Sequence, residues 1–308
     1  MNIEHLGVHD SISAVFPPER LVDALASVDP NVSIVRDGEY DDIDAVVTFA
    51  HDDAYFGQVE WVHCARAGYD DFPVERFEET GTILTNSSGI HGASVGETAV
   101  GMMLSLARCL HVARDAQNRG EWSRPEWDRP FTLFDQRVTV VGLGTLGQGI
   151  ARRADGLGMR VSGVRRTPAR PPHVREVYTP VDLHDAIADA KFVALTTPLT
   201  EETAHMFGAE EFDVMRDDAY LVNVARGGVV DQDALVDALE SGDIAGAGLD
   251  VFEEEPLPES SPLWEMDDVV VTPHVGAADR NYYQDIAALV RQNVLHASAD
   301  EEFVNRVA

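Results

Sequence analysis

The stretch RVTVVGLGTLGQGIA, residues 137–151, decides the predicted fold of this chain. Its first residues are apolar and β-branched, as in a buried strand, and its last residues suit a helix. Between them stands the pattern G-x-G-x-x-G, and a second apolar run follows at 160–164. A glycine-rich turn alone is a weak signal, but this strand–turn–helix–strand order is the context in which it binds a dinucleotide. We therefore predict a dinucleotide-binding domain.

The three glycines and the residues between them have separate expected roles. Gly142 permits the tight turn, Gly144 lets the backbone approach a pyrophosphate, and Gly147 lets the helix pack closely on the sheet. The amides of Thr145 and Leu146 lie at the expected helix N-terminus, where backbone N–H groups and the helix dipole favour phosphate. These five residues form the predicted pyrophosphate site.

The end of the 160–164 strand indicates which dinucleotide is bound. An NAD site has an acid here that accepts a hydrogen bond from the ribose 2′-hydroxyl. This chain instead has Arg165, Arg166 and Thr167, with no carboxylate before Glu176. Such donors suit a 2′-phosphate. The three residues predict a preference for NADP(H), with NAD(H) possible, and the alternative is a pair of solvated surface arginines.

Outward from this turn, strand-like runs alternate with helical segments on both sides of a long helix predicted at 94–118. Further helices are expected at 145–158 and 279–298, and 120–136 is expected to be irregular. The strand-like runs are 6–8, 32–35, 45–49, 61–65, 82–86, 137–144, 160–164, 191–198, 219–225, 244–252 and 269–274. This alternation predicts an α/β protein of two Rossmann-like, doubly wound parallel-sheet domains. Ligands bind beyond the carboxyl ends of such strands, so we expect the active site in the cleft between the domains.

The composition limits the possible partners. The 308 residues include 54 Asp and Glu against 23 Lys and Arg, a net charge of −31, and Lys191 is the only lysine. An acidic surface of this kind argues against binding to nucleic acid or to an anionic membrane. Excess acid with almost no lysine indicates a halophilic chain that works in molar salt, and the alternative is an ordinary acidic mesophilic protein.

Nothing in the sequence suggests a membrane or a secretory route. There is no apolar run of about 18 residues, the minimum for a transmembrane helix. The first ten residues lack the basic and apolar regions of a signal peptide. Two cysteines, Cys64 and Cys109, do not suggest a disulfide scaffold. We therefore expect a cytoplasmic location.

Several further motifs carry a family resemblance. The sequence resembles the D-isomer-specific 2-hydroxyacid dehydrogenase family in VVGLGTLGQGIA (140–151), TTPLTEETAHMF (196–207), LVNVARGGVVDQDAL (221–235), GAGLDVFEEEPLP (246–258) and VVVTPHVG (269–276). The resemblance implies a substrate-binding domain of residues 1–92 plus 281–308 and a dinucleotide-binding domain of residues 93–280. It also implies a homodimer formed through the cofactor domains, with 94–118 and 120–136 as the candidate interface.

The same resemblance implies a catalytic set of Arg226, Glu255 and His274, without a metal. Arg226 would pair with the substrate carboxylate and the keto oxygen, and His274 would be the general acid and base. Glu255 would hydrogen-bond His274 and keep it protonated for reduction. Taken singly, each residue has a plainer explanation. Arg226 could form a surface ion pair, His274 could be a structural histidine, and Glu255 could belong to a solvated acidic run at 253–255.

Contacts to the substrate carboxylate and to the cofactor also follow from the resemblance. The backbone amides of Ala67, Gly68 and Tyr69 would receive the substrate carboxylate. Asp250 would bind the nicotinamide carboxamide, although a buried aspartate could equally cap a helix. Two more residues match a loop beside the cofactor, namely Thr196 and Pro198.

The side of the site that selects the substrate is less determined. Phe49, Ala50 and His51 follow an expected strand and could face the substrate side chain, although core packing explains Phe49 as well. Arg66 departs from the small residue expected there, and its role is open. The leading interpretation is an NADP(H)-dependent D-2-hydroxyacid dehydrogenase, or 2-keto acid reductase, acting on a small aliphatic 2-keto acid. The alternatives are a glyoxylate/hydroxypyruvate reductase and a non-catalytic NAD(P)-sensing protein of the same fold.

The net charge generates a prediction about salt. At high ionic strength the Debye length falls to about 3 Å, so repulsion among the surface carboxylates is screened. We expect the melting temperature and the activity to rise as KCl is increased from about 0.1 M to about 2 M. Thermal unfolding and initial rates over this series measure the effect. A melting temperature and an activity that do not change after dialysis to low salt would show that the chain is an ordinary acidic protein.

Overall fold

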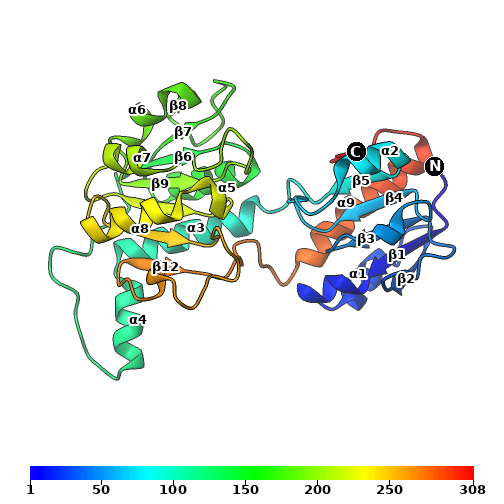
Figure 1. The fold of residues 1–308 in the computed structure, drawn as a ribbon, viewed down its shortest axis with the longest axis horizontal. Helices are drawn as coiled ribbons and strands as arrows, with labels where there is room; N and C mark the ends of the chain where they lie inside the picture. The colour runs from blue at the N-terminus through cyan, green and yellow to red at the C-terminus, as the bar shows by residue number, and fades with distance from the viewer. The chain divides into compact units, whose positions relative to one another are not determined.

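The computed structural model describes all residues from 1 to 308, and the chain divides into two compact units (Figure 1). The N-terminal unit comprises residues 1–91 and 278–308, and the central unit comprises residues 92–277. Each unit contains one sheet in which every strand is parallel to its neighbours. The predicted fold class, two doubly wound α/β domains, is therefore confirmed. The assignment of the substrate to one unit and of the dinucleotide to the other stays a prediction.

The N-terminal unit has a sheet of five strands in the order β2-β1-β3-β4-β5. Helices α1 and α9 bury apolar side chains against one face, among them Leu21 and Ile286, and α2 places Phe77 on the other. Because both faces are covered, β1, β3 and β4 are buried along almost their whole length rather than at alternate residues, whereas most of the edge strand β2 is not. The strands are β1 (His5–His9), β2 (Asn31–Val35), β3 (Ala45–Thr48), β4 (Trp61–Cys64) and β5 (Ile83–Asn86), and the helices are α1 (Pro18–Leu25), α2 (Val74–Thr80) and α9 (Tyr282–Ala299).

The central unit has a sheet of seven strands in the order β12-β11-β10-β9-β6-β7-β8. Helices α3 and α5 pack on one face, and α6, α7 and α8 pack on the other. The strands are β6 (Arg137–Val141), β7 (Arg160–Val164), β8 (Glu176–Tyr178), β9 (Phe192–Leu195), β10 (Tyr220–Asn223), β11 (Gly246–Leu249) and β12 (Val269–Val271). The helices are α3 (Gly92–Ala107), α4 (Leu110–Asn118), α5 (Thr145–Gly156), α6 (Leu183–Ile187), α7 (Ala209–Val214) and α8 (Gln232–Ser241).

Each sheet has one point where the direction of winding reverses. In the N-terminal unit this point lies between β1 and β3, and in the central unit it lies between β6 and β9. The crossover connections leave opposite faces of the sheet there, so the loops at the carboxyl ends separate and open a crevice where ligands bind. The glycine turn that follows β6 therefore stands at the switch point of the central sheet.

The structure differs from the prediction at two elements. The helix predicted at 94–118 is two helices, because Cys109 adopts a left-handed conformation with φ 53° between α3 and α4. The apolar spacing continues across this break, so periodicity alone does not reveal it. The short edge strand β8 was not predicted. The segment 120–136 contains no helix or strand, as predicted, and Figure 1 shows α4 and this segment extending away from the sheet of the central unit.

No helix in the structure combines the length and the apolar character needed to cross a membrane.

Candidate active site

The glycine turn after β6 has the geometry that its sequence predicts. Gly142 has a backbone φ of 96°, a value that residues other than glycine rarely adopt. A Cβ at Gly147 would lie 1.9 Å from the carbonyl oxygen of Gly142, so only glycine lets α5 start this close to the turn. A Cβ at Gly144 would have no neighbour within 4 Å, so this glycine is not required for packing within the protein. It leaves open space beside the turn instead.

The groups around this open space fit a dinucleotide. Helix α5 has no side-chain cap at its N-terminus, so the first amides, including those of Thr145 and Leu146, are available for phosphate. Thr196 follows β9 and closes the turn, with its Oγ1 2.5 Å from the Gly142 carbonyl oxygen. The Oγ1 of Thr197 is buried and has no hydrogen-bond partner, as expected of a group that a ligand satisfies. Thr197 was missed by the sequence analysis, although it stands inside the quoted TTP motif.

Pro198 lies next along this loop and is exposed. Its carbonyl oxygen accepts a hydrogen bond of 2.6 Å from the hydroxyl of Thr203. The bond holds the shape of the loop after Thr197.

The three residues after β7 lie on the surface of the central unit. Arg165 is half-buried, and its guanidinium donates to the carbonyl of Ala169 at 3.1 Å, whereas Arg166 and Thr167 are exposed. Neither arginine forms an ion pair with a carboxylate, although the chain has 54 acidic residues. The unexpected strand β8 lies beside β7 and binds the Arg165 amide through the carbonyl of Tyr178. The two guanidinium groups remain available to an anion.

Glu255 and His274 come together in the central unit. Nδ1 of the histidine lies 2.7 Å from Oε2 of the glutamate, and the other carboxylate oxygen accepts from the Phe252 amide at 3.0 Å. Half of the His274 side chain is exposed, and its Nε2 has no partner within the protein. A histidine held at one nitrogen by a carboxylate and open at the other is arranged for proton transfer. In the same acidic run, Glu253 pairs instead with His205 at 3.0 Å.

The turn that carries His274 is built around Asp250, which directly follows β11 and is buried. Its carboxylate accepts hydrogen bonds from the hydroxyl of Thr272 at 2.5 Å and from the amides of Val275 and Gly276 at 2.9 and 2.8 Å. The backbone of His274 also donates to the Asp250 carbonyl at 2.8 Å. The alternative that Asp250 caps a helix is wrong, because these donors belong to a turn. Thr272 comes before His274 in the chain, and Val275 and Gly276 come after it.

Arg226 follows β10 and is positioned by two neighbours that the sequence analysis did not single out. The buried Asn223 donates to the Arg226 carbonyl at 3.1 Å and accepts from the Ala225 amide at 3.0 Å, which fixes the turn. A Cβ at Gly227 would lie 1.8 Å from the carbonyl carbon of Phe252. The missing Cβ brings the Arg226 turn against the loop that ends in Glu255. The sequence feature that could have identified Asn223 is its amide side chain at the end of a buried strand.

In the N-terminal unit, the loop after β4 has the form of an anion site. Four consecutive carbonyl groups accept hydrogen bonds from within the unit: Ala65 from the Tyr282 hydroxyl, Arg66 from the Ser87 amide, Ala67 from the Asn86 side chain and Gly68 from the Cys64 thiol. The amides of Ala67, Gly68 and Tyr69 have no such partner. Successive unpaired amides of one loop form a concave site for an anion. This is the loop in which the sequence predicts carboxylate binding.

Arg66 lies against Phe49 and has a structural partner. The guanidinium carbon is 4.9 Å from the ring centre of Phe49, and one guanidinium nitrogen lies 2.5 and 2.7 Å from the two carboxylate oxygens of Asp71. The charge of Arg66 is therefore balanced within the loop. His51 packs against the rings of Tyr55, Phe56, Phe72 and Phe77, so packing explains this residue as well as substrate contact does.

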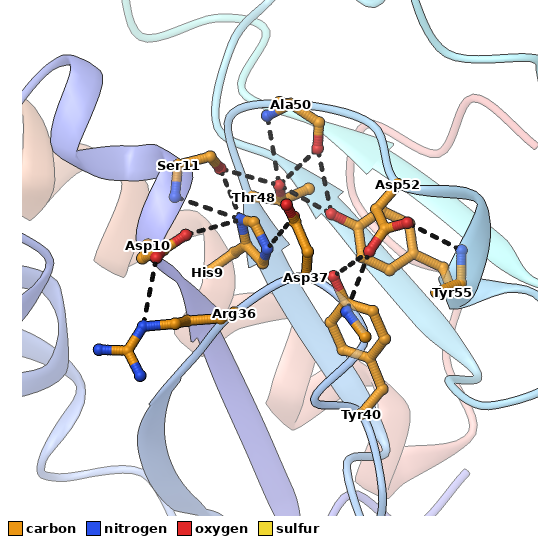
Figure 2. Close-up of polar contacts among 12 residues, drawn as sticks. His9, Asp10, Ser11, Arg36, Asp37, Tyr40, Thr48, Ala50, Asp52 and Tyr55 are labelled. Atoms are coloured by element: carbon orange, nitrogen blue, oxygen red, sulfur yellow. Dashed lines mark hydrogen bonds and ion pairs between the residues drawn. The ribbon is translucent and has the colours of Figure 1, made fainter.

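A polar network missed by the sequence analysis lies at the switch point of the N-terminal sheet (Figure 2). Ser11 after β1 contacts His9 at 2.8 Å and Thr48 at 3.2 Å, and the Tyr55 hydroxyl donates to Thr48 at 3.0 Å. Burial raises the pKa of Tyr55 to about 12.

Tyr40 and Asp52 continue the network. The Tyr40 hydroxyl donates to Asp52 at 2.8 Å. Burial, followed by this hydrogen bond, raises the pKa of Tyr40 well above its usual range. The network holds the segment after β3, which includes Ala50, in one conformation, because Thr48 donates to the Ala50 carbonyl at 2.6 Å and the Tyr55 hydroxyl oxygen lies 3.1 Å from the same carbonyl.

Comparison with known proteins gives a consistent result. The model of the NAD binding domain of D-isomer specific 2-hydroxyacid dehydrogenases matches residues 100–276. The chain is 37% identical to a glyoxylate reductase of Pyrococcus horikoshii over 237 residues, which cover 74% of this chain and 70% of that protein. It is 36% identical to a glyoxylate/hydroxypyruvate reductase B of Yersinia pestis over 233 residues, or 75% of this chain and 72% of that protein.

A solved structure agrees over almost the whole chain. The D-isomer specific 2-hydroxyacid dehydrogenase of Xanthobacter autotrophicus, in complex with NADPH and MES, superposes with a TM-score of 0.84 at 30% identity, covering 99% of this chain and 98% of that one.

The glycine turn generates a paired prediction. Replacing Gly144 with Val fills the open space without a clash inside the protein, so the melting temperature should stay within about 2 °C while dinucleotide binding weakens by about 100-fold or more. Gly147→Ala is the matched control, because its Cβ meets backbone and should lower the melting temperature instead. Thermal unfolding and titration of NADPH fluorescence measure the two effects. Unweakened binding by Gly144→Val would contradict the assignment of this space to the dinucleotide.

Proposed function

The chain belongs to the D-isomer specific 2-hydroxyacid dehydrogenase family, and on this basis we propose that it reduces small 2-keto acids, with glyoxylate and hydroxypyruvate as the preferred substrates and NADPH as the reductant. It is an NAD(P)-dependent oxidoreductase that acts on the CH–OH group of 2-hydroxy acids. The predicted family resemblance and the predicted enzyme class are confirmed. The alternative of a non-catalytic sensor receives no support from the named relatives, which are reductases and dehydrogenases.

The chemistry follows from the charges that reduction creates. A nicotinamide held by the glycine turn would supply the hydride for the carbonyl carbon. The oxygen then gains negative charge, and His274 delivers a proton to it from the exposed Nε2, which yields the hydroxyl group. Arg226 pairs with the substrate carboxylate and polarises the keto oxygen. In the N-terminal unit, the amides of 67–69 offer backbone N–H groups to a substrate carboxylate.

The observation that carries the proposal is the 2.7 Å contact between Glu255 and His274. The carboxylate holds Nδ1 of the imidazole, so Nε2 is left on the open side of the pair, where it can pass a proton to a substrate oxygen. In the oxidative direction, neutral imidazole accepts the proton from the hydroxyl group.

The choice of glyoxylate and hydroxypyruvate rests on two kinds of support. Relatives that this chain matches over about 70% of their length are named glyoxylate reductase and glyoxylate/hydroxypyruvate reductase B. In the N-terminal unit, Phe49 and the neutralised Arg66 leave no unpaired cation for a large anionic substituent. Small 2-keto acids with an uncharged substituent suit this surface.

The preference for NADPH rests on Arg165, Arg166 and Thr167. Two adjacent arginines stand where an NAD site has its carboxylate, and neither forms an ion pair within the protein. A 2′-phosphate offers the charge-assisted hydrogen bonds that they lack. The similar Xanthobacter structure was solved with NADPH, which is consistent with this proposal.

A homodimer through the cofactor domains accounts for the exposed segment after α3. Trp122 and Trp127 are 95% and 92% exposed, and Phe134 is 72% exposed. Large apolar side chains gathered in one segment are typical of a protein interface. Residues 108–129 also hold five arginines against four carboxylates, so this segment has no net negative charge, unlike the chain as a whole. It can therefore approach a second, acidic copy of the chain with less repulsion.

The working conditions are proposed from the composition and the cysteines. The net charge of −31 supports activity in molar salt. Cys64 and Cys109 are both free and buried, which supports a reducing cytoplasm. The acidic surface also argues against nucleic acid as a partner.

Initial rates with a panel of 2-keto acids and both cofactors in high salt test the proposed function. We expect the highest kcat/KM with glyoxylate or hydroxypyruvate and NADPH. Arg165→Asp removes a charge-assisted contact and introduces repulsion, so kcat/KM with NADPH should fall about 10- to 100-fold while the value with NADH changes little. Arg170→Asp is the matched control, because Arg170 is a nearby exposed arginine outside the predicted cofactor residues.

Equal kcat/KM values for NADPH and NADH in the unaltered enzyme would overturn the cofactor preference. Absence of turnover with every 2-keto acid would overturn the proposed reaction.

A further inference from the structure

Tyr282 connects the candidate carboxylate loop to the far end of the chain. It is the first residue of α9, and its side chain is buried. Its hydroxyl donates a hydrogen bond to the carbonyl of Ala65, which is the residue that follows β4 and precedes the loop. The Ala65 amide is also held, by the Thr48 carbonyl at 2.7 Å. The start of the loop is therefore fixed, because both the amide and the carbonyl of Ala65 are hydrogen-bonded.

His91 holds the Tyr282 hydroxyl from the other side. Its Nε2 lies 2.9 Å from the tyrosine oxygen, and both side chains are 6% exposed. The hydroxyl has one proton, which goes to Ala65, so the imidazole Nε2–H is the donor to the tyrosine. Burial lowers the pKa of His91 to about 4, so the imidazole is neutral at ordinary pH and keeps this tautomer. The order of donation is His91 to Tyr282 to Ala65.

The three residues come from distant parts of the sequence. His91 is the last residue of the N-terminal unit before the chain enters the central unit, and Tyr282 lies just after the chain returns at residue 278. Two hydrogen bonds thus join both crossing points of the chain to the loop, across sequence separations of 191 and 217 residues. Each buried polar group in this series has its partner, and loss of the tyrosine hydroxyl would remove the hydrogen bond to the Ala65 carbonyl.

We propose that Tyr282, held by His91, is a positioning residue that fixes the Ala65–Arg66 peptide and thereby aims the amides of 67–69 at the substrate carboxylate. The role in catalysis rests on the proposed function. Tyr282 does not touch the substrate in this account. It acts only through the loop, so its loss weakens carboxylate binding and leaves proton and hydride transfer almost unchanged.

The decisive variant is Tyr282→Phe, with Tyr283→Phe as the matched control. Tyr283 is the next residue of α9, also contacts Phe16, and has no bond to the loop. In Tyr282→Phe we expect KM for the keto acid to rise about three- to tenfold, with kcat within about twofold and NADPH binding unchanged. Tyr283→Phe should leave all three values as they are.

Hydrogen exchange gives a second readout that does not need activity. The amides of Ser87 and Phe72 donate to the carbonyls of Arg66 and Tyr69, so their exchange reports how firmly the loop is held. Both amides should exchange about three- to tenfold faster in Tyr282→Phe than in Tyr283→Phe, while amides of the central unit do not change.

The outcomes separate this proposal from the proposed function. Faster exchange of these two amides supports the positioning role of Tyr282 even if the unaltered protein turns over no 2-keto acid. That absence of turnover would overturn only the proposed reaction. Unchanged exchange and unchanged KM overturn the positioning role of Tyr282. A general rise in exchange, with KM and kcat both altered, assigns Tyr282 to folding alone and also overturns it. If Tyr282→Phe does not fold, His91→Leu keeps the hydroxyl but removes its donor, and the same comparison decides.

Discussion

The carboxylate of Asp250 is the contact on which the candidate chemistry depends. Three donors from 272–276 converge on it, and the chain between those donors carries His274 in a left-handed conformation with φ 52°. A residue other than glycine keeps such a conformation only when its surroundings determine it. Because the turn closes around Asp250, the imidazole is held beside Glu255 before any ligand arrives. The arrangement is preorganised for proton transfer.

Close backbone contacts bring the other parts of the site to the same edge of the central sheet. A Cβ at Gly149 would lie 1.8 Å from the Gly92 carbonyl oxygen, and Gly227 makes a similar approach to Phe252. These glycines let α5 meet the start of α3 and let the Arg226 turn meet the Glu255 loop. Parallel strands end at one edge, so the residues that follow them gather there without a special fold. The separate motifs of the sequence thus become neighbouring loops.

The sequence predicts the elements that depend on local pattern and misses those that depend on long-range contact. Buried parallel strands are continuous apolar runs, and the glycine turn has a fixed spacing, so both could be predicted from single segments. The break at Cys109 leaves the apolar spacing intact, and the bond from Tyr282 to Ala65 joins residues more than 200 positions apart. Thr197 shows the same limit, because an unpartnered hydroxyl is visible only after the chain has folded around it.

The pH dependence of Glu255→Gln tests the central claim, that the Glu255–His274 pair carries the proton in the reaction, most directly. Glutamine keeps the size and a hydrogen bond but removes the negative charge that favours imidazolium. Reduction needs imidazolium, so its rate should fall at a lower pH than in the unaltered enzyme. Oxidation of the hydroxy acid needs neutral imidazole, so it should become active at a lower pH. Both profiles must move toward acid together, with chemistry rate-limiting. Unchanged profiles in both directions would contradict the account and leave Glu255 as part of a solvated acidic run.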